Sequence, residues 1–182
     1  MRGLSALQAG LVTLPMAAMS ALLPPIAGRI VGRRGPRIPL VAGGAGIAAG
    51  SALLFLTLDD ATPLPMIVAA FVVFGAGFGL INPPITNAAV SGMPVTQAGV
   101  AAAVASTSRQ VGSALGVAVI GTLVTSRIAG GMATGFVPAA QVGWAVMTAC
   151  GLAVAVLGLV TTGKRARRSA ERTATALQPA GV

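Results

Sequence analysis

Acidic and metal-binding side chains are almost absent from this sequence. Its 182 residues include no histidine, one cysteine and three acidic residues. The lack of histidine excludes a Ser–His–Asp hydrolase, and without a Cys/His cluster no metal site or other resident cofactor is indicated. Paired carboxylates occur only at Asp59 and Asp60, between two apolar runs, so we do not expect an enzyme. The single Cys150 excludes an internal disulfide framework.

Charged residues are scarce, and the composition is that of a membrane protein. They make up 8% of the chain against 55% hydrophobic residues, and the mean hydropathy is +0.89. A soluble domain carries about 25% charged residues. The net charge of +9 would suggest a nucleic-acid partner in a soluble protein. Here the basic residues form two clusters beside apolar spans, so topology in lipid explains them and no nucleic acid is expected.

Five apolar segments are long enough to cross a membrane. They comprise residues 4–27, 38–58, 65–91, 98–126 and 142–162. Each reaches about 20 residues, the length that spans a hydrocarbon core, and in lipid such segments must be helical to satisfy their own backbone groups. We therefore predict an all-α integral membrane fold with five transmembrane helices over residues 1–162. The basic tail, residues 163–182, is polar and is expected to be disordered.

The basic residues also predict an orientation. Residues 28–37 carry four arginines and the tail carries five basic residues, whereas the segment at 59–64 is acidic. By the positive-inside rule the two basic regions lie in the cytoplasm of an inner (plasma) membrane protein, and the acidic segment lies outside. The C-terminus is then cytoplasmic and the N-terminus outside. Because Arg2 makes an outside N-terminus unexpected, we expect the chain to begin part-way through a larger protein.

One predicted span contains a charge, Arg109, about 12 residues into the fourth segment. An arginine at the centre of a membrane helix costs roughly 2.5–3.5 kcal/mol on insertion scales. Gly112 and Gly116 share its helix face, and Ser113 lies beside them, so a neighbouring backbone can come close. We expect this face to look into a polar cavity or onto a partner helix. The alternative is that Arg109 snorkels to the cytoplasmic interface.

Asn82, Pro83 and Pro84 lie toward the cytoplasmic end of the third predicted helix. Each proline removes a backbone donor and crowds the preceding turn, so a kink or a break is expected. Two interpretations remain open, namely helix termination and a hinge or gate. The pair Pro24 and Pro25 has the same role near the end of the first segment.

A glycine motif in the second segment has two interpretations. The run from Gly44 to Ala49 matches G-x-G-x-x-A and precedes two aspartates, which is the outline of a dinucleotide-binding fingerprint. The 12 residues 47–58 would have to hold a whole helix and a second strand before the acids, and they are too few. A soluble nucleotide-binding enzyme is therefore the least favoured hypothesis. The glycines of the second segment are better explained as a stripe for close helix packing, formed by Gly43, Gly46 and Gly50. Gly75 and Gly79 form a similar stripe in the third segment.

The segment at residues 28–37 resembles the signature loop of the major facilitator superfamily, roughly G-x-L-x-D-R-x-G-R-R between two adjacent helices. Gly32 replaces the aspartate of that motif, as is typical of the weaker copy in the second half of such transporters. The matching residues are Gly28, Arg33, Gly35 and Arg37, and the basic cluster also includes Arg29 and Arg34. The segments L-S-A-L-Q-A-G-L at 4–11, N-P-P-I-T-N-A-A at 82–89 and T-S-R-Q-V-G at 107–112 are also similar. Together they resemble the C-terminal half of the 14-helix drug:proton antiporters.

The resemblance implies a transporter of two six-helix halves, of which this chain is similar to the last five helices. It implies that the first and fourth spans line the interface between halves, turning Arg109, Gly112 and Gly116 toward the missing N-terminal half. The implied function is proton-coupled multidrug efflux by alternating access, with an amphipathic drug-like solute and protons as partners. The alternative is a small standalone membrane protein that acts by helix association with a structural or regulatory partner. Its glycine stripes would then be association faces.

Overall fold

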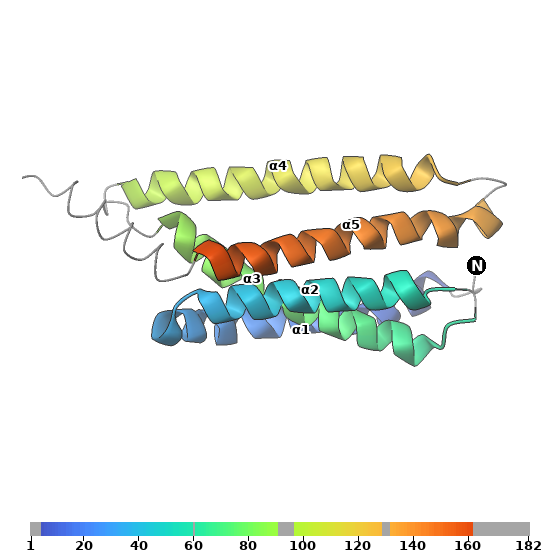
Figure 1. Ribbon diagram of the computed structural model, residues 1–182, viewed down its shortest axis with the longest axis horizontal. Coiled ribbons are helices and arrows are strands. Elements are labelled where there is room, and N and C mark those ends of the chain that lie inside the picture. Colours follow the sequence, from blue (N-terminus) through green and yellow to red (C-terminus); the bar gives the residue numbers. More distant parts are fainter. Residues whose placement is uncertain (1–4, 60, 91–96, 129–131, 162–182) are drawn as a thin grey trace, which may run out of the picture.

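The computed structural model consists of five long helices that run alternately in opposite directions along one axis (Figure 1). It describes residues 5–59, 61–90, 97–128 and 132–161. No strand occurs within these ranges, so the predicted all-α fold is confirmed. The helices are α1 (Ala6–Arg34), α2 (Arg37–Thr57), α3 (Leu64–Val90), α4 (Ala98–Thr125) and α5 (Met132–Thr161).

The predicted spans agree with α2, α3 and α4, but α1 and α5 are longer than expected. Pro24 and Pro25 lie inside α1, which continues to Arg34, so the predicted loop at residues 28–37 is mostly helix. Helix α5 begins at Met132 and passes through Pro138. Membrane helices tolerate proline because neighbouring helices and local adjustments satisfy the freed backbone groups, which is why proline marked neither end here. The predicted tail lies outside the described residues.

Gly35 closes the turn between α1 and α2. Its φ is 80°, and it is the residue with positive φ in the described part of the chain. The Gly35 N–H donates to the Val31 carbonyl at 2.9 Å and ends α1. A side chain is strained in this conformation, so the glycine is required here by backbone geometry.

Helix α2 packs between α3 and α5, and α1 packs along α3. The backbones approach closely at glycines, because a Cβ on Gly44 would lie 2.5 Å from the Ala155 nitrogen and one on Gly151 would lie 2.6 Å from the Ala48 nitrogen. The predicted packing stripes are confirmed by the same test, since Gly43, Gly46 and Gly50 meet α3, and Gly75 and Gly79 meet α1. The dinucleotide fingerprint is wrong, because its glycines lie inside α2 and residues 5–43, which precede them, contain no strand.

The apolar core lies between α2, α3 and α5. Leu54, Ile67 and Ala70 are buried there. The rings of Phe71 and Trp144 pack beside them with centroids 6.4 Å apart and a 50° tilt. Trp144 is the single tryptophan of the chain and therefore reports on this core.

Four helices are long and apolar enough to cross a membrane by length and composition, namely α1, α2, α3 and α5. Helix α4 has the length but is more polar, because the run Ser-Thr-Ser-Arg-Gln at residues 106–110 interrupts its apolar sequence. At 1.5 Å per residue, its 28 residues extend about 42 Å. Its polar run therefore needs a polar or protein environment if α4 also spans the membrane.

Candidate functional site

Helix α4 stands apart from the other helices (Figure 1). From residue 102 to residue 119 all its residues are exposed except Ala105. A Cβ on Gly112 or Gly116 would meet no atom within 4 Å, and Ser113 is exposed beside them. Farther along, Ile120 and Val124 face Gly143 of α5. The glycine face of α4 therefore has no covering helix in the described part of the chain.

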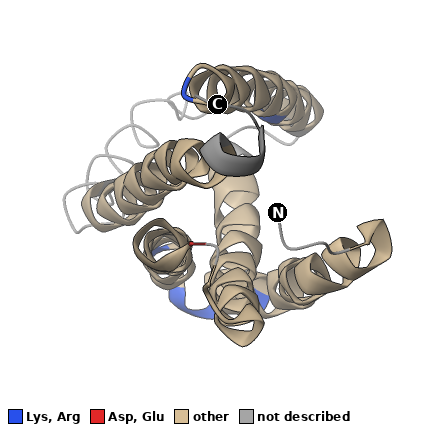
Figure 2. Ribbon diagram, turned by 90° about the vertical axis from the view of Figure 1, so that its right-hand side faces the viewer, with Lys and Arg blue, Asp and Glu red and all other residues tan. Residues whose placement is uncertain are grey.

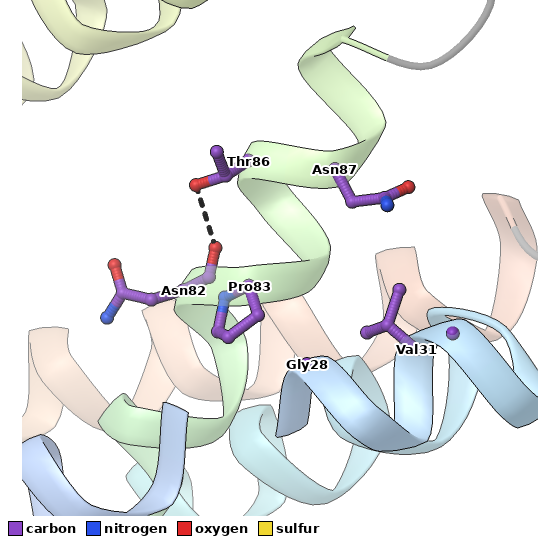
Figure 3. Close-up of a pocket in the computed structure, with 7 residues that line it drawn as sticks. Gly28, Val31, Asn82, Pro83, Thr86 and Asn87 are labelled. Carbon is purple, nitrogen blue, oxygen red and sulfur yellow. Dashed lines mark hydrogen bonds between the residues drawn. The ribbon is translucent and has the colours of Figure 1, made fainter. Parts of the chain in front are cut away.

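The Arg109 side chain reaches from α4 to α3. Its Nη1 donates a hydrogen bond to Thr86 Oγ1 at 3.0 Å. Thr86 Oγ1 in turn donates to the Asn82 carbonyl at 3.1 Å, the bond drawn in Figure 3. The Asn82 side-chain amide donates to the Phe78 carbonyl at 3.0 Å. The charged group of α4 is thereby linked to the α3 backbone directly before the proline pair.

Helix α3 is continuous through Asn82, Pro83 and Pro84. The interpretation of these residues as a helix end is therefore wrong. As in α1, neighbouring helices and local adjustments satisfy the backbone groups that proline frees. Each proline still removes one hydrogen bond from the helix. The bond from Thr86 to the carbonyl one turn earlier is of the kind that bends helices. The interpretation as a hinge or gate stays a prediction.

Two grooves flank Thr86 at the end of the bundle where α1 meets α2. The first, of about 610 Å³, lies between α1 and α3 (Figure 3). The second, of about 860 Å³, lies between α3 and α4 and combines apolar walls with one charge. The first is lined by Gly28, Val31, Gly32, Asn82, Pro83, Thr86 and Asn87, and the second by Ile85, Gln97, Val100, Ala101, Val104, Ala105, Ser108 and Arg109.

The structure brings some predicted site residues together and separates others. Gly28 of α1 shares the first groove with Asn82 and Pro83, and Arg109 lines the second groove. Pro84 is fully buried and lines neither. The face formed by Gly112, Ser113 and Gly116 continues along α4 beyond the second groove. The remaining predicted residues, Arg29, Arg33, Arg34, Gly35 and Arg37, lie at the α1–α2 turn.

Thr86 is the residue that sequence analysis missed. It lies within the N-P-P-I-T-N segment, one turn after Asn82, so its place on that helix was readable. Its partner Arg109 is 23 residues away on another helix, and no spacing within one helix predicts such a contact. A hydroxyl one turn beyond a proline pair was the available signal.

Most charges of the described residues lie at the two ends of the bundle. The arginines of the α1–α2 turn lie at one end, and Asp59, directly after α2, lies at the other end, as does Arg127 after α4 (Figure 1). In the described ranges no carboxylate lines either groove beside Thr86. The hydrogen-bond partner of the Arg109 guanidinium is thus a neutral hydroxyl, which leaves its positive charge available to the groove.

Comparison with known proteins places the chain in a family. Residues 1–117 match the model of the Major Facilitator Superfamily. Multidrug resistance protein Stp of Mycobacterium tuberculosis is 33% identical over 125 residues, covering 69% of this chain and 23% of that protein. The puromycin resistance protein of Streptomyces alboniger is 34% identical over 168 residues, covering 85% of this chain and 33% of that protein.

A third relative, the tetracenomycin C resistance and export protein of Streptomyces glaucescens, is 33% identical over 126 residues, covering 69% of this chain and 23% of that protein. The chain thus spans 23% to 33% of the length of these curated relatives. The family match covers most of the chain and coincides with helices apolar enough to cross a membrane. This chain is a multi-pass membrane member of the Major Facilitator Superfamily.

Proposed function

We propose that this chain supplies the last five helices of a proton-coupled multidrug efflux antiporter. The observation that supports this best is the uncovered face of α4, with Arg109, Gly112 and Gly116 exposed. A membrane helix that carries a charge and polar residues needs protein or water, not lipid, against that face. A second half of the transporter, packed on α4, provides both.

The orientation follows from the arginines of the α1–α2 turn. By the positive-inside rule, this end of the bundle faces the cytoplasm and the N-terminus of α1 lies outside, in an inner (plasma) membrane. Both grooves beside Thr86 lie at this end, so solute enters them from the cytoplasmic side. Export then requires the opposite end of the bundle to open in turn.

The groove between α3 and α4 suits an amphipathic solute. Its volume of about 860 Å³ is within the range of about 300–1,000 Å³ typical of small-molecule sites. Ile85, Val100 and Val104 provide apolar walls, and Arg109 provides a charge. Two relatives are named for puromycin and tetracenomycin C, and we propose solutes of this drug-like class.

In the transport cycle the α4 face moves against the other half as the two halves rock about the central site. Thr86 holds the Arg109 guanidinium on the groove wall, and the proline pair lets α3 bend at that level. Because no carboxylate lines the described grooves, the groups that bind and release the coupled proton belong to the other half.

The test is drug resistance in a bacterial strain that lacks its own efflux pumps. The complete reading frame that contains this chain is compared with its Arg109→Ala variant and with the chain alone. We expect resistance to puromycin and tetracenomycin C only from the complete frame with Arg109 intact, at equal amounts of protein in the membrane. Unchanged resistance in the Arg109→Ala variant contradicts the role of that residue. Copurification of the chain alone with one specific partner, without resistance, favours the standalone association protein instead.

A further inference from the structure

A third, smaller groove lies at the α1–α2 turn and shares no lining residue with the two grooves at Thr86. It encloses about 250 Å³. Three basic and three branched apolar side chains line it, namely Arg29, Arg33, Arg34, Ile26, Ile30 and Ile38. Arg37 directly precedes Ile38 in the first turn of α2, so four arginines occur close to this turn, where Figure 2 shows blue ribbon.

These guanidinium groups have no counter-charge in the described part of the chain. Arg29, Arg33 and Arg34 are all exposed, and no described residue forms an ion pair or hydrogen bond with their side chains. Arg29 and Arg33 are also one helical turn apart on α1, a spacing at which like charges destabilise a helix. An anion bound between them removes that repulsion.

The shape of the arginine side chain fits a phosphate group. A guanidinium presents a planar fork of donors that binds phosphate oxygens in pairs. The first turn of α2 adds to the positive potential, because Pro36 supplies no side-chain cap to its free N–H groups. Inorganic phosphate and the headgroup of a phospholipid share this chemistry.

The isoleucines decide between these two sources. Ile26 and Ile38 are 48% and 46% exposed, although they flank a charged groove. Inorganic phosphate leaves them in water, whereas the acyl chain of a lipid covers them. The groove also lies where two helices of membrane-spanning length meet in a tight turn, and a bilayer that both helices cross would have its headgroups near such a turn.

We propose that this groove is a binding site for an anionic phospholipid. The guanidinium groups of Arg29, Arg33 and Arg34 hold the lipid phosphate, and Ile26, Ile30 and Ile38 contact its acyl chains. The positive-inside rule explains why arginines occur on this side of a membrane, but it does not require isoleucines between them. The lipid site does not depend on the transport function, so the two proposals are tested by separate experiments.

Native mass spectrometry of the purified protein in detergent tests the proposal with dipalmitoyl phosphatidylglycerol as the probe. Phosphatidylcholine of the same chain length serves as the control for charge, because its headgroup has no net charge. Soluble glycerol 3-phosphate serves as the control for acyl-chain contact, because it has no acyl chains. We expect phosphatidylglycerol to bind more tightly than phosphatidylcholine, and glycerol 3-phosphate not to displace it at millimolar concentration. Displacement by glycerol 3-phosphate overturns the assignment to lipid and indicates a soluble phosphate ligand.

The variants locate the binding. In Arg29→Gln/Arg33→Gln we expect phosphatidylglycerol to bind about 30-fold more weakly, which corresponds to about 1 kcal/mol for each basic residue. Arg127→Gln removes an exposed arginine after α4, at the other end of the bundle, and is expected to bind like the parent protein. The basic residues of segment 163–182 are present in every variant, so they do not account for a difference.

Two further variants keep the test decisive. Arg29→Lys/Arg33→Lys keeps the charges and is expected to retain most of the preference for phosphatidylglycerol. Arg33→Gln alone makes the smaller change, about fivefold, if the double variant fails to fold by circular dichroism. The proposal is overturned if Arg29→Gln/Arg33→Gln binds phosphatidylglycerol as tightly as the parent protein does. If only Arg33→Gln folds, the same comparison is made with that variant.

Discussion

Gly44 and Gly112 are both helix glycines, and the structure predicts opposite effects of replacing them with alanine. At Gly44 the new Cβ would lie 2.5 Å from the Ala155 nitrogen and 2.8 Å from the Gly151 carbonyl oxygen. Ordinary contacts need about 3.5–4.0 Å, so α2 and α5 must separate by about 1 Å. At Gly112 the new Cβ meets nothing within 4 Å.

The expected magnitudes follow from these contacts. Overpacking of one methyl group costs about 1–3 kcal/mol, and the higher helix propensity of alanine returns up to about 1 kcal/mol. With about 2 kcal/mol for the overpacking, the middle of that range, Gly44→Ala is expected to lower the free energy of unfolding by about 1–2 kcal/mol. Gly112→Ala has only the propensity gain and is expected to leave the stability of the chain unchanged or to raise it slightly.

Thermal unfolding in detergent measures the difference, with Trp144 fluorescence as the probe of the core between α2, α3 and α5. For a chain of this size, 1–2 kcal/mol corresponds to a fall in Tm of about 2–8 °C for Gly44→Ala. The matched variant Gly112→Ala is expected to keep the Tm. An unchanged Tm in Gly44→Ala, or an equal fall in both variants, refutes the packing argument.

Two other substitutions test the site and the turn. Thr86→Val removes the hydroxyl that binds Arg109. Since such a hydrogen bond contributes about 1 kcal/mol, this variant is expected to reduce efflux by the complete transporter about fivefold. Thr86→Ser keeps the hydroxyl and is expected to retain the efflux of the parent transporter. A drug-accumulation assay in which the serine and valine variants behave alike contradicts this. Gly35→Ala forces a side chain onto a residue with a φ of 80° and is expected to lower the Tm, whereas Gly32→Ala, inside α1 with no atom within 4 Å of its Cβ, is not. Equal Tm values for these two variants, measured by circular dichroism, count against the strain at Gly35.

Hydropathy and charge predicted most of the fold. Apolar length located α2, α3 and α4 nearly to the residue, because a membrane leaves few alternatives to a helix. The glycine stripes were also predictable, since glycines one turn apart on an apolar helix have no other common use. Proline misled the analysis at Pro24 and at Pro83, because the penalty known from water is offset when neighbouring helices pack around the break.

The site was harder to predict. Arg109 stood out because a charge in an apolar helix is costly, and Gly112 and Gly116 followed from helical spacing. The contact of Arg109 with Thr86 depends on how α4 lies against α3, which no local pattern contains. The groove at the α1–α2 turn was hidden for a different reason. The loop expected there is a helix, and only the helix places arginine and isoleucine on one face.

The central claim is that the α4 face around Arg109 borders a solute path in the complete transporter. The direct measurement is the reactivity of a cysteine at Ser113 with a water-soluble maleimide, after Cys150, the single cysteine of this chain, and every cysteine in the rest of the transporter are replaced by alanine. Thiols react as thiolates, which form in water and not in lipid. We predict that Ser113→Cys is labelled and that puromycin slows the labelling, whereas Leu152→Cys, exposed on α5, is not labelled. Labelling of Ser113→Cys no faster than that of Leu152→Cys, with no effect of puromycin, contradicts the claim.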